Sequence, residues 1–308
     1  MDDFLSVDDL SRAEFLALLD LADELKASRG SRRDDLGGRT VALVFEKPST
    51  RTRVSFEVAV HELGGHALSL SGVDLQIGRG EAIADTGTVL SRYVHAIVLR
   101  TFEQSRLTEL AAAATVPVVN ALSDHEHPCQ ALADLQTIRA ARGALAGVSL
   151  AYVGDGNNVA HSLLLAGALV GMSVRVATPA GYEPGADVVS RARELAASSG
   201  GEVLVTDDPR AAAADADVVY TDVWASMGQE AEAKGRARTF APYQVDTALM
   251  AVAAPHAIFL HCLPAHRGEE VAAEVMDGSA SRVFDQAENR LHTEKALLLQ
   301  LLPPARAT

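Results

Sequence analysis

Hydrophobic and polar positions along the chain alternate between two patterns. Short runs of branched aliphatic residues, such as 41–47, predict buried strands. The amphipathic stretches that follow them, such as 51–63, predict helices. Because strand and helix take turns along the whole chain, the pattern predicts the α/β fold class, with mostly parallel sheets flanked by helices.

The same pattern gives a set of expected elements. In the first half we expect strands at 41–47, 66–70, 96–100 and 116–120, and helices at 51–63, 82–93, 107–114 and 130–141. In the second half we expect strands at 148–153, 173–178, 202–206, 217–221, 257–260 and 282–284, with helices at 211–216 and 294–302.

A chain of 308 residues is long enough for two domains. The Arg142-Gly143 pair after a long helix predicts the seam between them. We therefore expect domains at 1–142 and 143–290, joined by interdomain helices. Residues 291–308 are expected to form a C-terminal helix that packs back on the first domain.

Composition narrows the class of protein. Lys and Arg total 27 against 41 Asp and Glu, a net charge of −14 that argues against a general nucleic-acid binder but leaves room for a local basic pocket. Two distant cysteines, Cys129 and Cys262, fit a reducing compartment. The acidic N-terminus has no signal-peptide pattern, and the apolar stretches are too short to span a bilayer. We expect a cytoplasmic protein without a membrane partner.

Five consecutive polar residues, Ser49 to Arg53, stand where a strand turns into a helix. Peptide N–H groups in a first helical turn lack partners and the helix dipole favours an anion, while hydroxyls and guanidiniums add donors. The alternative is an ordinary helix cap followed by two solvated arginines. Five donors without an apolar interruption favour a site for a phosphorylated small molecule.

Four motifs then occur in order along the chain. They are Ser-Thr-Arg-Thr-Arg at 49–53, His-Pro-Cys-Gln at 127–130, Asp-Val-Trp-Ala-Ser-Met-Gly at 222–228 and His-Cys-Leu-Pro at 261–264. Together they resemble the aspartate/ornithine carbamoyltransferase family, and the last two resemble its ornithine branch. The resemblance extends from the first helix to the Ala-Glu-Asn-Arg run at 287–290.

The resemblance implies transfer of the carbamoyl group from carbamoyl phosphate to the side-chain amine of L-ornithine, giving L-citrulline and phosphate, as in arginine biosynthesis. Another amine, such as putrescine, is the alternative acceptor. It implies no metal and no organic cofactor. It also implies a homotrimer, or a multiple of trimers, with active sites at subunit interfaces. The first domain would bind carbamoyl phosphate and the second would bind ornithine.

By the same resemblance, phosphate would be held by Ser49, Thr50, Arg51, Thr52 and Arg100. His127, with Arg100 and Thr52, would donate to the carbamoyl oxygen. Taken alone, Arg100 reads as a solvated strand end and His127 as a capping or core histidine.

The carbamoyl NH₂ would be bound by Gln130 and by the main-chain carbonyl of Cys262 or Leu263, and Arg290 would reach the same group. Without the motifs, Arg290 reads as a cation flanking a helix. Gln76 resembles the loop that reaches a neighbouring subunit's carbamoyl phosphate. Some family members carry a lysine in that loop, and this chain has Arg79 there instead.

The amino-acid substrate would be held by Asn158, Asp222, Ser226 and Met227. A carboxylate such as Asp222 pairs naturally with an α-ammonium group. The alternatives are that Asp222 caps a turn and that Met227 packs in a core.

Cys262 would lie beside the substrate amine and, with Asp222, help to keep it deprotonated, so the implied catalytic set is His127, Arg100, Asp222 and Cys262. A nucleophilic thiol is an alternative, although direct attack by the amine requires no acyl-enzyme. A zinc site at His261, Cys262 and His266 is disfavoured, because the ligands lack the paired spacing of structural sites.

The sequence argues against two other classes of protein, a dinucleotide-binding enzyme and a non-catalytic binding module. The run 154–160 follows a strand and opens a helix, as in a dinucleotide-binding fold. The third glycine is missing, and no acidic residue precedes Glu183 where the ribose would need one. A non-catalytic binding module would not need His127, Gln130 and Cys262 together.

Overall fold

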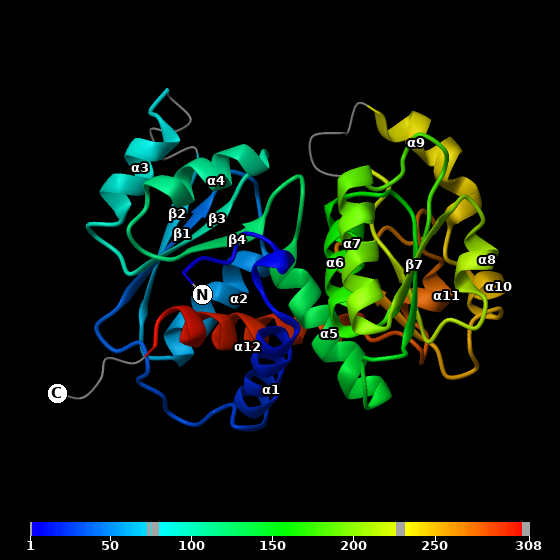
Figure 1. Ribbon diagram of the computed structural model, residues 1–308, viewed down its shortest axis with the longest axis horizontal. Helices are drawn as coiled ribbons and strands as arrows, with labels where there is room; N and C mark the ends of the chain where they lie inside the picture. Colours follow the sequence, from blue (N-terminus) through cyan, green and yellow to red (C-terminus); the bar gives the residue numbers. More distant parts are fainter. Residues whose placement is uncertain (1, 73–74, 76–79, 226–231, 304–308) are drawn as a thin grey trace. The chain divides into compact units, whose positions relative to one another are not determined.

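The computed structural model describes residues 2–72, 75, 80–225 and 232–303. The chain divides into two compact units, Met1–Ala133 with Glu288–Thr308, and Asp134–Ala287. Both divisions fall inside helices, α5 (Pro128–Arg142) and α12 (Val283–Leu301) (Figure 1). The first division therefore lies within the long helix rather than at the Arg142-Gly143 pair that follows it.

The first unit is built on a parallel sheet with strand order β2-β1-β3-β4. Its strands are β1 (Thr40–Phe45), β2 (His66–Ser71), β3 (Ala96–Arg100) and β4 (Val118–Leu122). The central strands β1 and β3 are buried almost throughout. This explains their continuous aliphatic sequences, because helices cover both faces of a parallel sheet.

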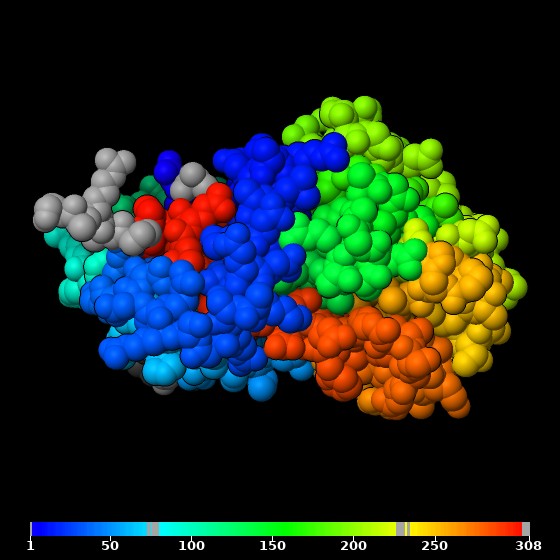
Figure 2. Space-filling model, turned by 90° about the horizontal axis from the view of Figure 1, so that it is seen from below, coloured from blue at the N-terminus to red at the C-terminus, as the bar shows by residue number. Residues whose placement is uncertain are grey.

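Helices α3 (Ile83–Leu90) and α4 (Gln104–Ala113) cover one face of this sheet and α2 (Arg51–Glu62) the other (Figure 1). Alternate residues of β1 serve the two faces, and Ala42 and Val44 join the cluster under α3 and α4. The 3₁₀ turn Val7–Asp9 and helix α1 (Arg12–Ala27) precede the sheet. Lys26 of α1 donates to Asn289 of α12 at 2.7 Å. Figure 2 shows the end of α12, in red, at the surface beside blue N-terminal segments.

The second unit has a parallel sheet of order β7-β6-β5-β8-β9. Its strands are β5 (Ser149–Val153), β6 (Ser173–Ala177), β7 (Glu202–Thr206), β8 (Val218–Thr221) and β9 (Ile258–His261). The fold class predicted from the sequence is thus confirmed, with two parallel sheets flanked by helices.

Helices α6 (Asn158–Val170) and α7 (Ala186–Ser199) lie together on one side of the second sheet (Figure 1). Every residue of α6 from Val159 to Val170 is buried, and α6 packs against both the sheet and its neighbour α7. This explains why its sequence is apolar all round. The other side carries α8 (Pro209–Ala213), α9 (Ala233–Phe240), the 3₁₀ turn Ala241–Tyr243, α10 (Thr247–Met250) and α11 (Ala273–Met276).

Most expected elements occur within a few residues of their predicted ends, and the strands at 96–100 and 202–206 coincide with β3 and β7. The strand expected at 282–284 is wrong. Ser281 makes only an isolated bridge to Phe259, and α12 begins at Val283. A short apolar run does not distinguish a strand from the first turn of a helix. In the part of the chain that the structure describes, no helix has the length and apolarity that crossing a membrane requires.

Two phenylalanines of the second unit test where its core lies. Phe259 of β9 is fully buried, whereas Phe284 in the first turn of α12 is 69% exposed. We expect Phe259→Ala to lower the free energy of unfolding by about 3–5 kcal/mol, because a large cavity replaces the ring. Phe284→Ala should change it by about 0.5 kcal/mol or less. Urea unfolding followed by circular dichroism measures both, and equal losses would contradict this placement of the core.

Candidate active site

The phosphate-site motif lies at the start of α2. Thr50 is the N-cap residue and its side chain makes no capping hydrogen bond. Thr52, in the first turn of α2, is buried, while Ser49 and Arg51 are partly exposed. The hydroxyl groups and the helix N-terminus therefore share one short segment, as an anion site requires.

Arg100 reaches the same segment from the neighbouring strand. It pairs in register with Phe45 at the end of β1, and its Nη1 lies 3.4 Å from Ser49 Oγ. Since β1 and β3 are parallel, their carboxyl ends meet at one edge of the sheet. Arg100 is only 7% exposed, so it is not the solvated strand end of the alternative interpretation.

Positive charge surrounds His127, which precedes α5. The ring is 5% exposed. Burial, together with the nearby charges of Arg290, Arg100 and Arg51, holds its pKa well below the usual range. The imidazole is therefore neutral at physiological pH, as a hydrogen-bond donor to a carbamoyl oxygen should be.

Arg290 joins this group from α12. Its Nη2 donates to Thr52 Oγ1 at 2.8 Å, and its Nη1 donates to Gln130 Oε1 at 3.3 Å. Arg290 is 2% exposed and lies inside α12 rather than flanking a helix. The structure thus brings Thr52, Gln130 and Arg290 together within the first unit.

Lys47 is a residue of this region that the sequence interpretation missed. Burial and the neighbouring charge of Arg100 lower the pKa of its ammonium group, and its Nζ lies 4.0 Å from the centre of the Phe102 ring. The signal was present, because Lys47 directly precedes the Pro-Ser-Thr-Arg run. It adds one more cation to the edge of the sheet where an anion is expected.

The second unit places Asp222 beside Cys262. Asp222 follows β8 and is 5% exposed. Cys262 Sγ donates to its Oδ1 at 2.9 Å, and Asn157 Nδ2 donates to its Oδ2 at 2.8 Å. Both oxygens of the carboxylate are thus oriented by neighbouring side chains.

Asn157, which the sequence analysis did not single out, makes this contact with Asp222. Asn157 is the N-cap of α6, and its Oδ1 accepts from the Val159 and Ala160 amides and from the Tyr152 hydroxyl. Asn158 is the first residue of α6 and is partly exposed. The capping function of an Asn before a helix was the sequence signal that could have identified Asn157.

The segment after β9 has an uncommon backbone. Leu263 has a φ of 62°, in the left-handed region that a branched residue rarely adopts. Its amide donates to His261 Nδ1 at 2.8 Å, and His261 Nε2 lies 3.3 Å from Glu270 Oε1. Strained backbone of this kind concentrates at functional sites.

These contacts also bear on the disfavoured zinc site. Among the residues that the structure describes, possible ligand atoms gather in two sets, Asp222 with His261 and Cys262, and His266 with Glu269 and Glu270. His266 and Cys262 are therefore in different sets. In the first set, the two ring nitrogens of His261 face the Leu263 amide and Glu270.

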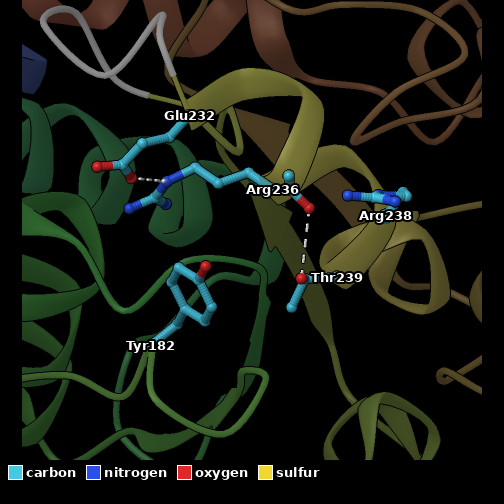
Figure 3. Close-up of a pocket in the computed structure, with 6 residues that line it drawn as sticks. Tyr182, Glu232, Arg236, Arg238 and Thr239 are labelled. Carbon is cyan, nitrogen blue, oxygen red and sulfur yellow. Dashed lines mark hydrogen bonds and ion pairs between the residues drawn. The ribbon is translucent and has the colours of Figure 1, made fainter.

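A surface pocket of about 550 Å³ lies beside α9 and is lined by Tyr182, Glu232, Gly235, Arg236, Arg238 and Thr239 (Figure 3). Of the predicted site residues that the structure describes, none lines it. Arg236 donates to Asp155 at 2.8 Å and to the Trp224 carbonyl at 2.9 Å. Arg236 thus connects α9, beside the pocket, to the turn that carries Asn157.

Three of the predicted residues, Gln76, Ser226 and Met227, lie outside the described residues, as does Arg79.

Comparison with known proteins agrees with this geometry. Residues 2–140 match the sequence profile described as aspartate/ornithine carbamoyltransferase, carbamoyl-P binding domain. Residues 146–301 match that of the Asp/Orn binding domain. This chain belongs to the aspartate/ornithine carbamoyltransferase family. Arg290 falls within the second profile although it packs in the first compact unit.

Individual family members are close to this chain. It is 64% identical over 307 residues to the ornithine carbamoyltransferase of Parafrankia sp. (strain EAN1pec), covering 99% of this chain and 97% of the relative. The structure of ornithine carbamoyltransferase from Pyrococcus furiosus matches with a TM-score of 0.96 and 53% identity, covering 99% and 98% of the two chains. The anabolic ornithine carbamoyltransferase from Campylobacter jejuni matches with a TM-score of 0.93 and 40% identity, covering 98% and 99%.

The Asn157–Asp222 contact in the amino-acid-binding half of this family member is open to test. Asn157→Asp keeps an oxygen that caps α6 but replaces the donor to Asp222 with a second carboxylate. We expect the KM for the amino-acid substrate to rise about tenfold or more, because like charges then face each other. Steady-state kinetics with each substrate varied in turn checks this.

Asn157→Ser is the matched control, because it keeps an oxygen that can cap α6 without adding a charge, and it should have the smaller effect. Equal KM values for the two variants would contradict the like-charge explanation.

Proposed function

We propose that this protein transfers the carbamoyl group of carbamoyl phosphate to the side-chain amine of L-ornithine, giving L-citrulline and phosphate. The observation that carries the proposal is the oriented Asp222–Cys262 pair, which stands in a chain that matches named ornithine carbamoyltransferases over nearly its full length. Putrescine, the alternative acceptor, has no α-carboxylate or α-ammonium group for such a site to select.

In the first unit, Arg51, Arg100 and the start of α2 would hold the phosphate. A guanidinium can bind two phosphate oxygens at once through parallel hydrogen bonds, and the helix N-terminus adds peptide N–H donors. Ser49, Thr50 and Thr52 would add hydroxyl donors. Because the phosphate is also the leaving group, these contacts would stabilise the charge that it gains as the C–O bond breaks.

Neutral His127 would donate to the carbamoyl oxygen as that oxygen becomes negative. A guanidinium has only donors, so Arg290 is expected to face an oxygen of the substrate rather than its NH₂ group. Gln130 has an amide oxygen and would bind the carbamoyl NH₂, with the carbonyl of Cys262 or Leu263. Loss of one such oxyanion donor typically costs about 10²–10³ in kcat.

In the second unit, Asp222 would pair with the α-ammonium group of ornithine, and Asn158 would bind the neighbouring carboxylate. Ser226 and Met227 would complete this contact, and Gln76 would serve the carbamoyl-phosphate site of a neighbouring subunit. Asp222 and Cys262 would keep the side-chain amine neutral, so that its lone pair attacks the carbonyl carbon. The C–N bond forms, the C–O bond to phosphate breaks and the proton on the nitrogen passes to the departing phosphate, without a covalent enzyme intermediate.

The metabolic function, cellular location and assembly of the enzyme are part of the same proposal. The anabolic relative from Campylobacter jejuni supports a function in arginine biosynthesis. A cytoplasmic location and a homotrimer, or a multiple of trimers, follow from the family resemblance. Sedimentation equilibrium would measure the assembly directly.

A direct test compares citrulline-type product formation from carbamoyl phosphate with ornithine, putrescine, N-acetylornithine and aspartate as acceptors. We expect turnover that is selective for ornithine. Preference for another amine would overturn the acceptor assignment while leaving the carbamoyl-phosphate site in place. No turnover with any of them would overturn the transferase proposal.

Two substitutions separate the tasks of the units. Arg51→Ala should raise the KM for carbamoyl phosphate about 10- to 100-fold, because a hydrogen bond to a charged group is lost. Asp222→Ala should instead raise the KM for ornithine by a similar factor. Circular dichroism confirms that both variants fold. Equal loss of both affinities in either variant would contradict the division of tasks.

A further inference from the structure

A buried carboxyl group lies one helical turn after Arg290. Glu294 of α12 is 1% exposed, and its Oε1 lies 3.1 Å from Arg290 Nη2. The sequence interpretation gave it no function. An acidic side chain at such a position is costly unless it is paired or protonated.

The pair is connected to the carbamoyl-phosphate site through the guanidinium. The same Nη2 that meets Glu294 donates to Thr52 Oγ1, and Nη1 donates to Gln130 Oε1. Thr52 and Gln130 are neutral acceptors. Of these three acceptors, Glu294 is the one that ionises. Its ionisation therefore changes the net charge around the Arg290 guanidinium while the hydrogen bonds stay the same.

The surroundings of Glu294 favour its neutral form. On its own helix it faces Arg290, α2 contributes Ser55, and α5 contributes the fully buried thiol of Cys129. The next residue, Lys295, is paired with Glu62 at 2.8 Å instead. Burial raises the pKa of Glu294 to about 7, although Arg290 and hydrogen bonding by Ser55 act in the opposite direction.

We propose that Glu294 is a positioning residue for carbamoyl-phosphate binding, which holds the Arg290 guanidinium toward Thr52 and Gln130 and sets how much of its charge the phosphate dianion meets. This inference rests on the proposed function of the site. The protonated carboxyl still accepts a hydrogen bond from Arg290 but leaves its charge uncompensated. The ionised carboxylate compensates that charge and weakens the attraction for an anion.

The ionisation of Glu294 makes the affinity for carbamoyl phosphate depend on pH. Affinity for carbamoyl phosphate is highest while Glu294 is protonated and falls as the pH rises through about 7. By reciprocity, an anion bound beside Arg290 makes Glu294 harder to ionise, so binding is accompanied by proton uptake near neutral pH.

The decisive variant is Glu294→Gln, which keeps the acceptor oxygen and removes the charge. Between about pH 6 and about pH 9, we expect the wild-type KM for carbamoyl phosphate to rise about three- to tenfold more than that of E294Q. The KM for ornithine should not show this difference. Glu294→Ala, which removes the acceptor as well, should raise the KM for carbamoyl phosphate over the whole range.

Glu288→Gln is the matched control. Glu288 is an acid on the same helix, but its side chain is 42% exposed and pairs with Arg29. This variant should follow the wild-type pH profile. Thermal unfolding adds a second readout, because the raised pKa of Glu294 means that the folded state loses stability as the pH rises from about 4.5 to about 7. E294Q should lack this loss, so its advantage in Tm over wild type should grow across that range.

Calorimetric titration with inorganic phosphate, in two buffers of different ionisation enthalpy, measures proton uptake without turnover. The difference between wild type and E294Q cancels the ionisation of phosphate itself. We expect wild type to take up more protons than E294Q. Equal uptake with identical KM profiles would overturn the proposal for Glu294, whereas an inactive wild type that shows the uptake difference would overturn only the transferase function.

Discussion

Parallel strands all present their carboxyl ends at the same edge of a sheet, and both halves of this protein place their functional side chains there. The order of the first sheet reverses between β1 and β3, which carry the Ser49–Thr52 segment and Arg100. The order of the second reverses between β5 and β8, which carry Asn157 and Asp222. At such a reversal the following loops diverge to opposite faces and leave a crevice. One geometric rule therefore locates both candidate sites.

The first of these edges concentrates positive charge in a chain whose net charge is −14. Lys47, Arg51, Arg100 and Arg290 belong to one small region. Burial and the nearby arginines lower the pKa of His127, and burial and Arg100 lower the pKa of Lys47. Cations gathered in one small region favour the binding of an anion there. The acidic surface elsewhere does not cancel this local field, because salt screens distant exposed charges more strongly than buried ones.

The second edge is organised by hydrogen bonds around a single carboxylate. Asn157 is held by two helix amides and the Tyr152 hydroxyl, so its amide group can direct only its N–H toward Asp222. The Arg236–Asp155 ion pair fastens α9 to the same turn. Precise orientation of a small number of polar groups is what selects an amino-acid head group over a simple amine.

The sequence by itself determined the alternating α/β pattern, because the central strands are buried on both faces and the helices have their own periodicity. It also predicted the phosphate segment, because five donors at a strand–helix junction need no distant partner to suggest an anion. The sequence alone does not reveal the contacts of residues whose partners lie far away in the chain. Taken without the family motifs, Arg290 reads as a helix-flanking cation, and Asn157 and Glu294 have no predicted function. Only the tertiary structure decided these, because their function depends on partners such as Thr52 and Asp222 that lie far away in the sequence.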